Sequence, residues 1–179
     1  TRDDGTFVEG TPIDMGSRSD TAPEGRNSYL HYQDGVLTIH GKVFVSSSNN
    51  SPVHVSSGSL TVRGSGALSL YGMGVPALIV STNAKIDFAL TPNDSNEQLH
   101  ISSNSCAAVR GDLTVSSGGR IVLSTSDFLN EDSTDVYNTI DGNADIQVES
   151  LLLHNETGGA CVNGDLTVKA EKYCQIVNQ

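Results

Sequence analysis

Short runs in which apolar and polar residues alternate recur along most of this chain. The clearest is a five-residue phrase, Gly-x-Leu-Thr-Val or a close variant, which occurs at residues 35–39, 58–62, 111–115 and 164–168. Weaker copies at 84–88 and 144–148 keep a Leu or Ile two residues before a Phe or Val. Alternation with a period of two places the apolar side chains on one face of a strand. Each copy therefore predicts a short β-strand.

Two further apolar runs follow most copies of this phrase. The second runs lie at residues 43–45, 67–70, 99–101, 121–123 and 151–153, and the third runs at 52–55, 77–80, 107–109, 137–140 and 159–162. The order of first, second and third strand repeats about five and a half times, which makes an internal repeat the main feature of the chain.

A unit of three short strands cannot bury its own apolar face, but a stack of such units builds a continuous core. The pattern therefore predicts an all-β fold, a right-handed parallel β-helix with three strands per coil over residues 34–179. Residues 1–33 do not follow the repeat and are expected to form a cap with a flexible loop. Equivalent apolar positions would form one inward ladder, comprising Leu37, Leu60, Ile86, Leu113, Ile146 and Leu166.

Other architectures fit the pattern less well. An antiparallel β-sandwich also has short strands separated by frequent turns, but it does not require one phrase to recur four times. No segment carries a sustained 3.6-residue apolar period, which disfavours helical repeats. The asparagine-bearing consensus of leucine-rich repeats is missing as well.

With three strands per coil, Gly-x-Leu-Thr-Val phrases and corners led by Gly41, Gly66 and Gly119, the chain resembles the right-handed parallel β-helix proteins of bacteria. In repeat style it is similar to carbohydrate-binding β-helix domains of secreted and cell-wall proteins. This resemblance covers residues 35–177. It implies a secreted or cell-surface location, an acidic or plant-wall polysaccharide as ligand, and calcium bound by surface carboxylates.

Charge narrows the range of partners. The formal net charge is -11, and the 10 Lys and Arg residues are spread thinly along the chain. Nucleic acid requires a clustered basic footprint, so it is not expected as a partner. Anionic lipid is disfavoured for the same reason, and no apolar run is long enough to predict membrane insertion. The three cysteines, Cys106, Cys161 and Cys174, lie in runs of apolar or small residues and are expected to be buried free thiols.

The loop from Ser124 through Asp135, in the fourth coil, is a candidate ligand-binding site. It is long, and loops on one side of a solenoid often form its binding face. Its candidate ligand-binding residues are Asp127, Asp132, Asp135 and Tyr137. The alternative is a solvated turn that binds nothing.

Three aspartates at the leading edge of the first strands are a candidate metal site. If Asp112, Asp145 and Asp165 belong to consecutive coils, they stack into an acidic column. Stacked carboxylates repel one another unless a cation lies between them, so the column is a candidate Ca²⁺ site. The alternative is that Gly-Asp only forms a turn.

These features favour a binding module for polysaccharide over other functions. Tyr71, Tyr137 and Tyr173 are candidates for stacking on sugar rings. A structural or adhesin module with a protein partner is the main alternative. A polysaccharide lyase or hydrolase is a weaker one, because no convincing set of catalytic residues is visible. Arg63, Arg110 and Arg120, the only arginines of the repeat region, do not share a repeat position.

Overall fold

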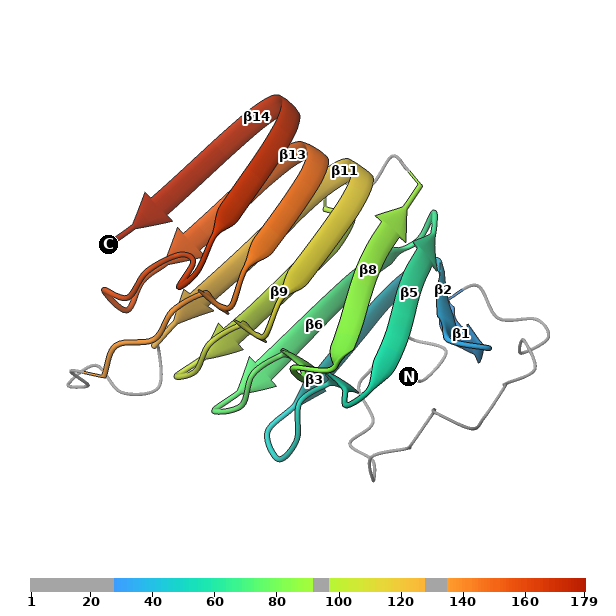
Figure 1. Ribbon diagram of the computed structural model, residues 1–179, viewed down its shortest axis with the longest axis horizontal. Helices are drawn as coiled ribbons and strands as arrows, with labels where there is room; N and C mark the ends of the chain where they lie inside the picture. Colours follow the sequence, from blue (N-terminus) through green and yellow to red (C-terminus); the bar gives the residue numbers. More distant parts are fainter. Residues whose placement is uncertain (1–27, 92–96, 128–134) are drawn as a thin grey trace.

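The computed structural model describes residues 28–91, 97–127 and 135–179, which form a solenoid of stacked β-coils (Figure 1). Successive coils lie side by side along the long axis, and the described chain runs from one end of the stack to the other. Within these ranges every regular element is a strand. None of the described residues form a helix that is long and apolar enough to cross a membrane.

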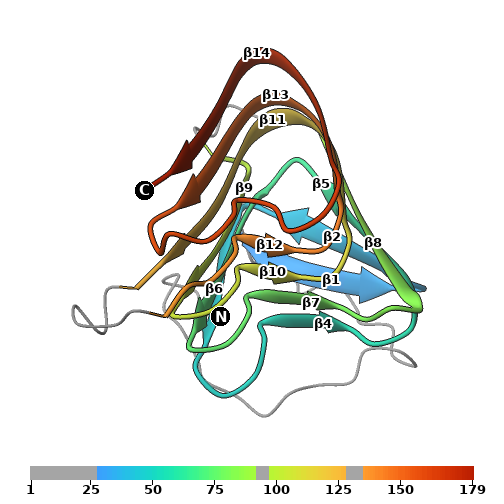
Figure 2. The same ribbon diagram turned by 60° about the vertical axis from the view of Figure 1, so that its left-hand side comes forward.

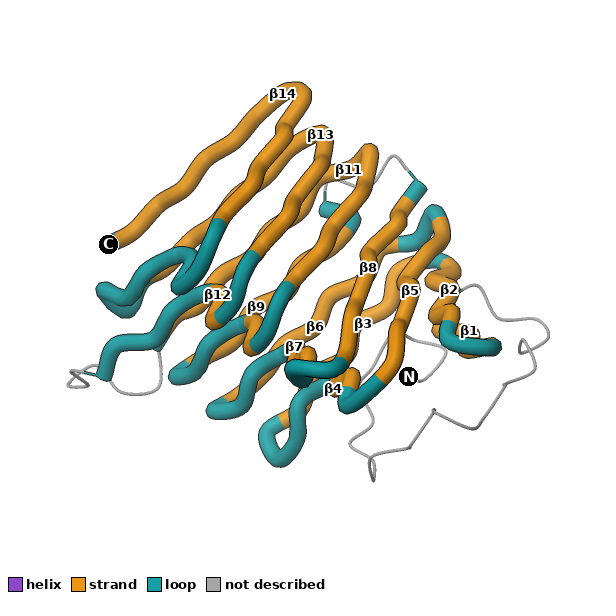
Figure 3. The backbone as a smooth tube through the Cα atoms, viewed as in Figure 1, coloured by secondary structure: helices purple, strands orange, loops and turns teal. Residues whose placement is uncertain are grey.

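Two sides of each coil come from the first and second strands of the repeat. The first side contains β2 (Val36–His40), β5 (Gly58–Gly64) and β8 (Ala84–Leu90), and the second contains β3 (Lys42–Ser47), β6 (Ala67–Met73) and β9 (Leu99–Asn104). In the later coils one long strand covers both sides, namely β11 (Leu113–Ser126), β13 (Ala144–Asn155) and β14 (Leu166–Asn178). Figure 3 shows these three strands turning the corner while the loops gather on the opposite side of the stack.

The third side closes each coil with very short strands. These are β4 (Val53–Val55), β7 (Leu78–Val80), β10 (Val109–Arg110) and β12 (Ile140–Asp141), in parallel register. A bridge from Ile140 to Val162 continues this side into the next coil. Figure 2 shows the three sides around a common interior. The predicted fold class, a parallel β-helix with three strands per coil, is confirmed.

The core consists of ladders of equivalent apolar residues. On the second side, for example, Leu68, Leu99, Ile121 and Leu151 pair in register and are all buried. Stacking places each of these side chains between similar neighbours above and below. This arrangement buries small and medium aliphatic side chains without requiring many aromatic residues.

The first-strand ladder differs from the prediction at two of its members. Leu37 pairs with Val62, not with Leu60, and Ile146 pairs with Val115, not with Leu113. Both copies are shifted by two residues, which keeps every side chain on its expected face because strands alternate with a period of two. In the later copy, the tight turn at Gly142 sets the shift, since Gly142 packs directly on the backbone of Gly111.

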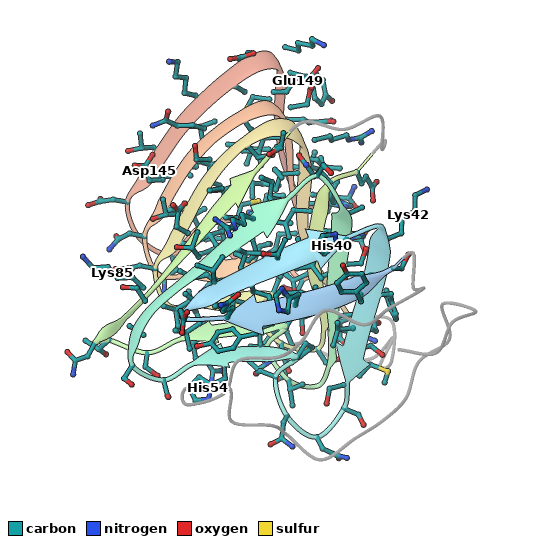
Figure 4. The ribbon with its side chains drawn as sticks, turned by 90° about the vertical axis from the view of Figure 1, so that its right-hand side faces the viewer. His40, Lys42, His54, Lys85, Asp145 and Glu149 are labelled. Carbon is teal, nitrogen blue, oxygen red and sulfur yellow. The ribbon has the colours of Figure 1, made fainter. Side chains whose placement is uncertain are left out.

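An antiparallel hairpin covers the N-terminal end of the stack. β1 (Tyr29–Gln33) pairs with β2, and both cross in front of the coils when the stack is viewed from this end (Figure 4). Ile39 of β2 is 1% exposed, and a Cβ at Gly64 or Gly66 would overlap with it. These two glycines therefore allow the hairpin to lie close against the second coil. The rest of the expected cap, residues 1–27, lies outside the described residues.

The other end of the described stack is β14, which has a strand neighbour on one side only, β13. Core-facing side chains on β14 are accordingly exposed, including Leu166 at 36% and Ile176 at 51%. Cys106 and Cys161 are buried free thiols as predicted. The prediction for Cys174 is wrong, because this thiol faces the open side of β14 and is exposed.

Candidate functional site

The predicted column of three aspartates does not form. Asp145 pairs with Thr114 on one side and with Thr167 on the other. The residue that stacks between Asp112 and Asp165 is Asn143, whose side chain contacts both. The two-residue shift of this copy explains the difference, because the true counterpart of Gly111-Asp112 is Gly142-Asn143.

Asn143 places an uncharged side chain between Asp112 and Asp165 and forms hydrogen bonds with both residues. Its backbone N–H and its Nδ2 both donate to Oδ1 of Asp112, at 2.8 and 3.1 Å. Its Oδ1 accepts from the backbone N–H of Asp165 at 2.9 Å. Asp145 is exposed and lies on the outer surface of the first side (Figure 4). Among the described residues, no group of three or more His, Cys, Asp or Glu side chains is placed to hold a metal ion.

The residues of the predicted ligand-binding loop are partly brought together. Asp127 accepts a hydrogen bond from Ser105, and the Tyr137 hydroxyl donates to Oδ2 of Asp135 at 3.2 Å. Asp132 lies outside the described residues. Among the described members of this group, Tyr137 and Asp135 are therefore in contact, whereas Asp127 contacts Ser105.

Buried groups of the next coil hold Tyr137 in place. Asn155 is fully buried, and its Nδ2 donates to the backbone carbonyl of Tyr137 at 2.8 Å and to that of Ala160 at 3.0 Å. The hydroxyl of Thr157 accepts from the backbone N–H of Tyr137 at 2.9 Å. Desolvation raises the pKa of the Tyr137 phenol, and the negative charges of Asp135 and Asp127 raise it further. The phenol therefore stays protonated and able to donate at neutral pH.

A separate groove lies on the outer surface of the second side, over the first three coils. Its volume is about 320 Å³, and it is lined by Phe44, Ser69, Leu70, Tyr71, His100 and Ser102. Phe44 and Tyr71 lie on neighbouring strands at diagonal positions, because Phe44 pairs with Ser69 and Tyr71 lies two residues further on. On the next strand His100 pairs with Ser69, so it is diagonal to Tyr71 in the opposite direction and lies in the same register as Phe44. Three rings thus follow one another across three coils.

The groove combines aromatic rings with hydroxyl groups and carries little charge. Phe44 is 44% exposed, and Ser69 and Ser102 add hydroxyls next to the rings. The only titratable side chains in its lining are Tyr71 and His100. Nδ1 of His100 lies 3.4 Å from Oε2 of Glu97. Such a surface presents flat apolar area together with hydrogen-bonding groups.

Of the groove residues, the sequence had singled out only Tyr71 as a stacking candidate. Phe44, His100, Ser69 and Ser102 were not singled out, although they occupy outward positions of the second runs. Their alternation with core residues was visible, but which outward residues meet across coils depends on the pairing register. A search for aromatic residues at the outward positions of adjacent second runs would have found Phe44.

Comparisons with models of known protein families, with curated proteins and with solved structures found no match. The fold and the arrangement of the side chains are therefore the basis for a functional conclusion. They define this chain as a parallel β-solenoid protein with a groove on one outer face.

Proposed function

We propose that this chain is a binding module for neutral polysaccharide, and that the groove over β3, β6 and β9 holds the sugar chain. The observation that carries the proposal is the staggered arrangement of Phe44, Tyr71 and His100 on three neighbouring strands, with hydroxyls beside the rings. Sugar rings present apolar C–H faces and hydroxyl edges, and a surface that alternates rings with hydroxyls complements both.

Charge favours a neutral polymer over an acidic one. The net charge of the chain is -11, so an acidic polysaccharide would be repelled over long distances unless cations screened it. The groove lining contains no Asp, Glu, Lys or Arg. We therefore expect binding that does not require calcium. Because polysaccharides of this kind are met outside cells, the proposal implies a secreted or cell-surface protein.

Affinity electrophoresis in gels that contain xylan, glucomannan or soluble β-glucan tests this function. At least one of these polymers should retard the chain, equally with calcium and with EDTA. Replacing Phe44 or Tyr71 with Ala should weaken binding, measured from the retardation, by about fivefold or more, since an aromatic contact contributes roughly 1 kcal/mol or more. Tyr173→Ala is the matched control, because Tyr173 is an exposed aromatic residue in the last described coil. Equal losses in all three variants, or no retardation by any polymer, would refute the proposal.

A module that joins a protein partner is the second candidate, and β14 favours it. This strand of 13 residues leaves one backbone edge and several core-facing side chains exposed. Such an edge accepts an added strand from a partner. Ile176→Lys would abolish an association of this kind, as measured by sedimentation, and would leave retardation by polysaccharide unchanged.

A further inference from the structure

The corner between the first and second sides is uneven in the last three coils. Two residues, Gly118 and Gly119, separate the paired positions Ser117 and Arg120. The next coil has a single residue at this point, Glu149, and the last has two, Glu171 and Lys172. Glu149 lies at the edge of the stack in Figure 4 and forms an ion pair with Lys172.

This unevenness accompanies a recess of about 270 Å³ on the outer surface of the corner. Its lining comes from four consecutive coils and comprises Leu90, Ser116, Ser117, Gly118, Gln147, Val148, Lys169 and Glu171. The corner at Glu149 is one residue shorter than the corners of the coils on either side, and Gly118 contributes no side chain to the recess. The recess therefore lies where the corner length changes from coil to coil.

The polar groups of the recess are free to bind a ligand. Ser116, Gln147 and Lys169 pair with one another in register on three neighbouring strands, and all three are exposed. Within the described residues their side chains make no hydrogen bond or ion pair with protein groups. Ser117 is different, since its hydroxyl donates to Oε1 of Gln98 at 2.7 Å and supports the wall of the recess.

The exposed part of the lining suits a neutral polar molecule. One ammonium group, Lys169, and one carboxylate, Glu171, balance in charge, and Gln147 and Ser116 both donate and accept hydrogen bonds. Leu90 and Val148 also line the recess, but they are 4% and 3% exposed and belong to the hydrophobic core. Hydrogen bonds from hydroxyls to charged groups are stronger than those between neutral groups.

We propose that this recess is a second carbohydrate site, which binds a single neutral sugar unit. Gln147 and Ser116 would form hydrogen bonds with its hydroxyls, and Lys169 and Glu171 would strengthen these contacts. The inference rests on the proposed function, since it adds a second contact point for the same class of ligand. Two sites on one chain raise the apparent affinity for a polymer that reaches both.

Titration of the isotope-labelled chain with methyl glucoside, methyl galactoside, methyl mannoside and methyl xyloside, followed by amide NMR spectra, tests the inference. At least one glycoside should shift the amides of Gly118, Gln147 and Val148. Gln147→Ala and Lys169→Ala should each weaken this response about fivefold, as expected for one lost hydrogen bond. Thr167→Ala is the matched control, because Thr167 is exposed on the same strand and does not line the recess.

The same spectra separate this inference from the proposed function. Shifts at Tyr71 and His100 report the groove, and shifts at Gly118 and Gln147 report the recess. A response at the groove alone would overturn the second site and leave the proposed function standing. A response at the recess alone would support the second site and count against the groove as the polysaccharide site. Shifts at the recess with methyl glucuronoside but with no neutral glycoside would also overturn the inference, because they would identify an anion site.

Discussion

Asn143 lies directly above Asp112 in the stack and donates two hydrogen bonds to the same carboxylate oxygen, at 2.8 and 3.1 Å. This contact joins two turns that are 31 residues apart in sequence. It replaces the acidic column that the repeated Gly-Asp dipeptides had predicted.

Removing either partner should destabilise the fold modestly. We expect Asp112→Ala and Asn143→Ala each to lower the free energy of unfolding by about 1 kcal/mol, measured by urea denaturation. The double variant should cost less than the sum of the two, because the partners share one interaction. Asp145→Ala is the control and should change stability by less than about 0.5 kcal/mol. If Asp145→Ala lowered the free energy of unfolding as much as Asp112→Ala, the result would contradict the observed register.

Gly142 should tolerate no side chain. Its φ is +153°, and a Cβ there would overlap with the backbone of Gly111 in the coil below. We expect Gly142→Ala to lower the free energy of unfolding by at least about 2 kcal/mol, from overpacking and backbone strain together. Gly58 also has a positive φ, +72°, but a Cβ there meets nothing within 4 Å. Gly58→Ala should therefore lower the free energy of unfolding by only about 1 kcal/mol. Equal losses of stability in Gly142→Ala and Gly58→Ala would refute the packing argument.

Asn155 should be the most important buried polar side chain for stability. Both of its amide protons are used by backbone carbonyls, and its Oδ1 accepts from the backbone N–H of Thr157 at 2.9 Å. Asn155→Ala leaves these buried groups without partners and should lower the free energy of unfolding by about 3 kcal/mol, measured by thermal or urea denaturation. Asn178 occupies the paired position in the last described coil and is exposed. Asn178→Ala should be almost neutral, and a comparable loss there would count against this explanation.

Tyr137 should ionise at higher pH than an ordinary tyrosine. Desolvation and the charges of Asp135 and Asp127 raise its pKa above 10.0. Absorbance titration of the chain, with Tyr137→Phe subtracted, should show this directly, and Asp135→Asn should lower the Tyr137 pKa toward the ordinary value. Since the folded pKa exceeds the unfolded one, the contribution to stability is present below pH 10 and decreases as the pH rises through the folded pKa. An unchanged Tyr137 pKa in Asp135→Asn would show that Asp135 does not act on the phenol.

The three thiols should differ in reactivity. Burial raises the pKa of Cys106 and of Cys161, which lowers the thiolate fraction and also restricts access. Cys174 is exposed. A colorimetric disulfide reagent should therefore label one thiol quickly in the native chain and all three after denaturation. Cys174→Ser should remove the fast phase, and its persistence would place the reactive thiol elsewhere.

The amino-acid sequence alone indicates the repeat structure of this fold. Alternation in the first, second and third runs identified the strands, their order and their inward faces. Local patterns suffice for this because the period of two in a strand assigns each side chain to a face without reference to its neighbours. The inward orientation of Leu68, Leu99, Ile121 and Leu151 follows directly from such runs.

Lateral register required the tertiary structure. A shift of two residues keeps every side chain on its face, so the alternation in 144–148 was compatible with two alignments. The close packing of Gly142 on Gly111 selects one of them, and it places Asn143 where an aspartate had been expected. Likewise, the groove of Phe44 and Tyr71 and the recess at Gln147 and Lys169 depend on which residues of separate coils become neighbours. Contacts between coils join residues that are far apart in sequence, and packing at the turns decides those contacts.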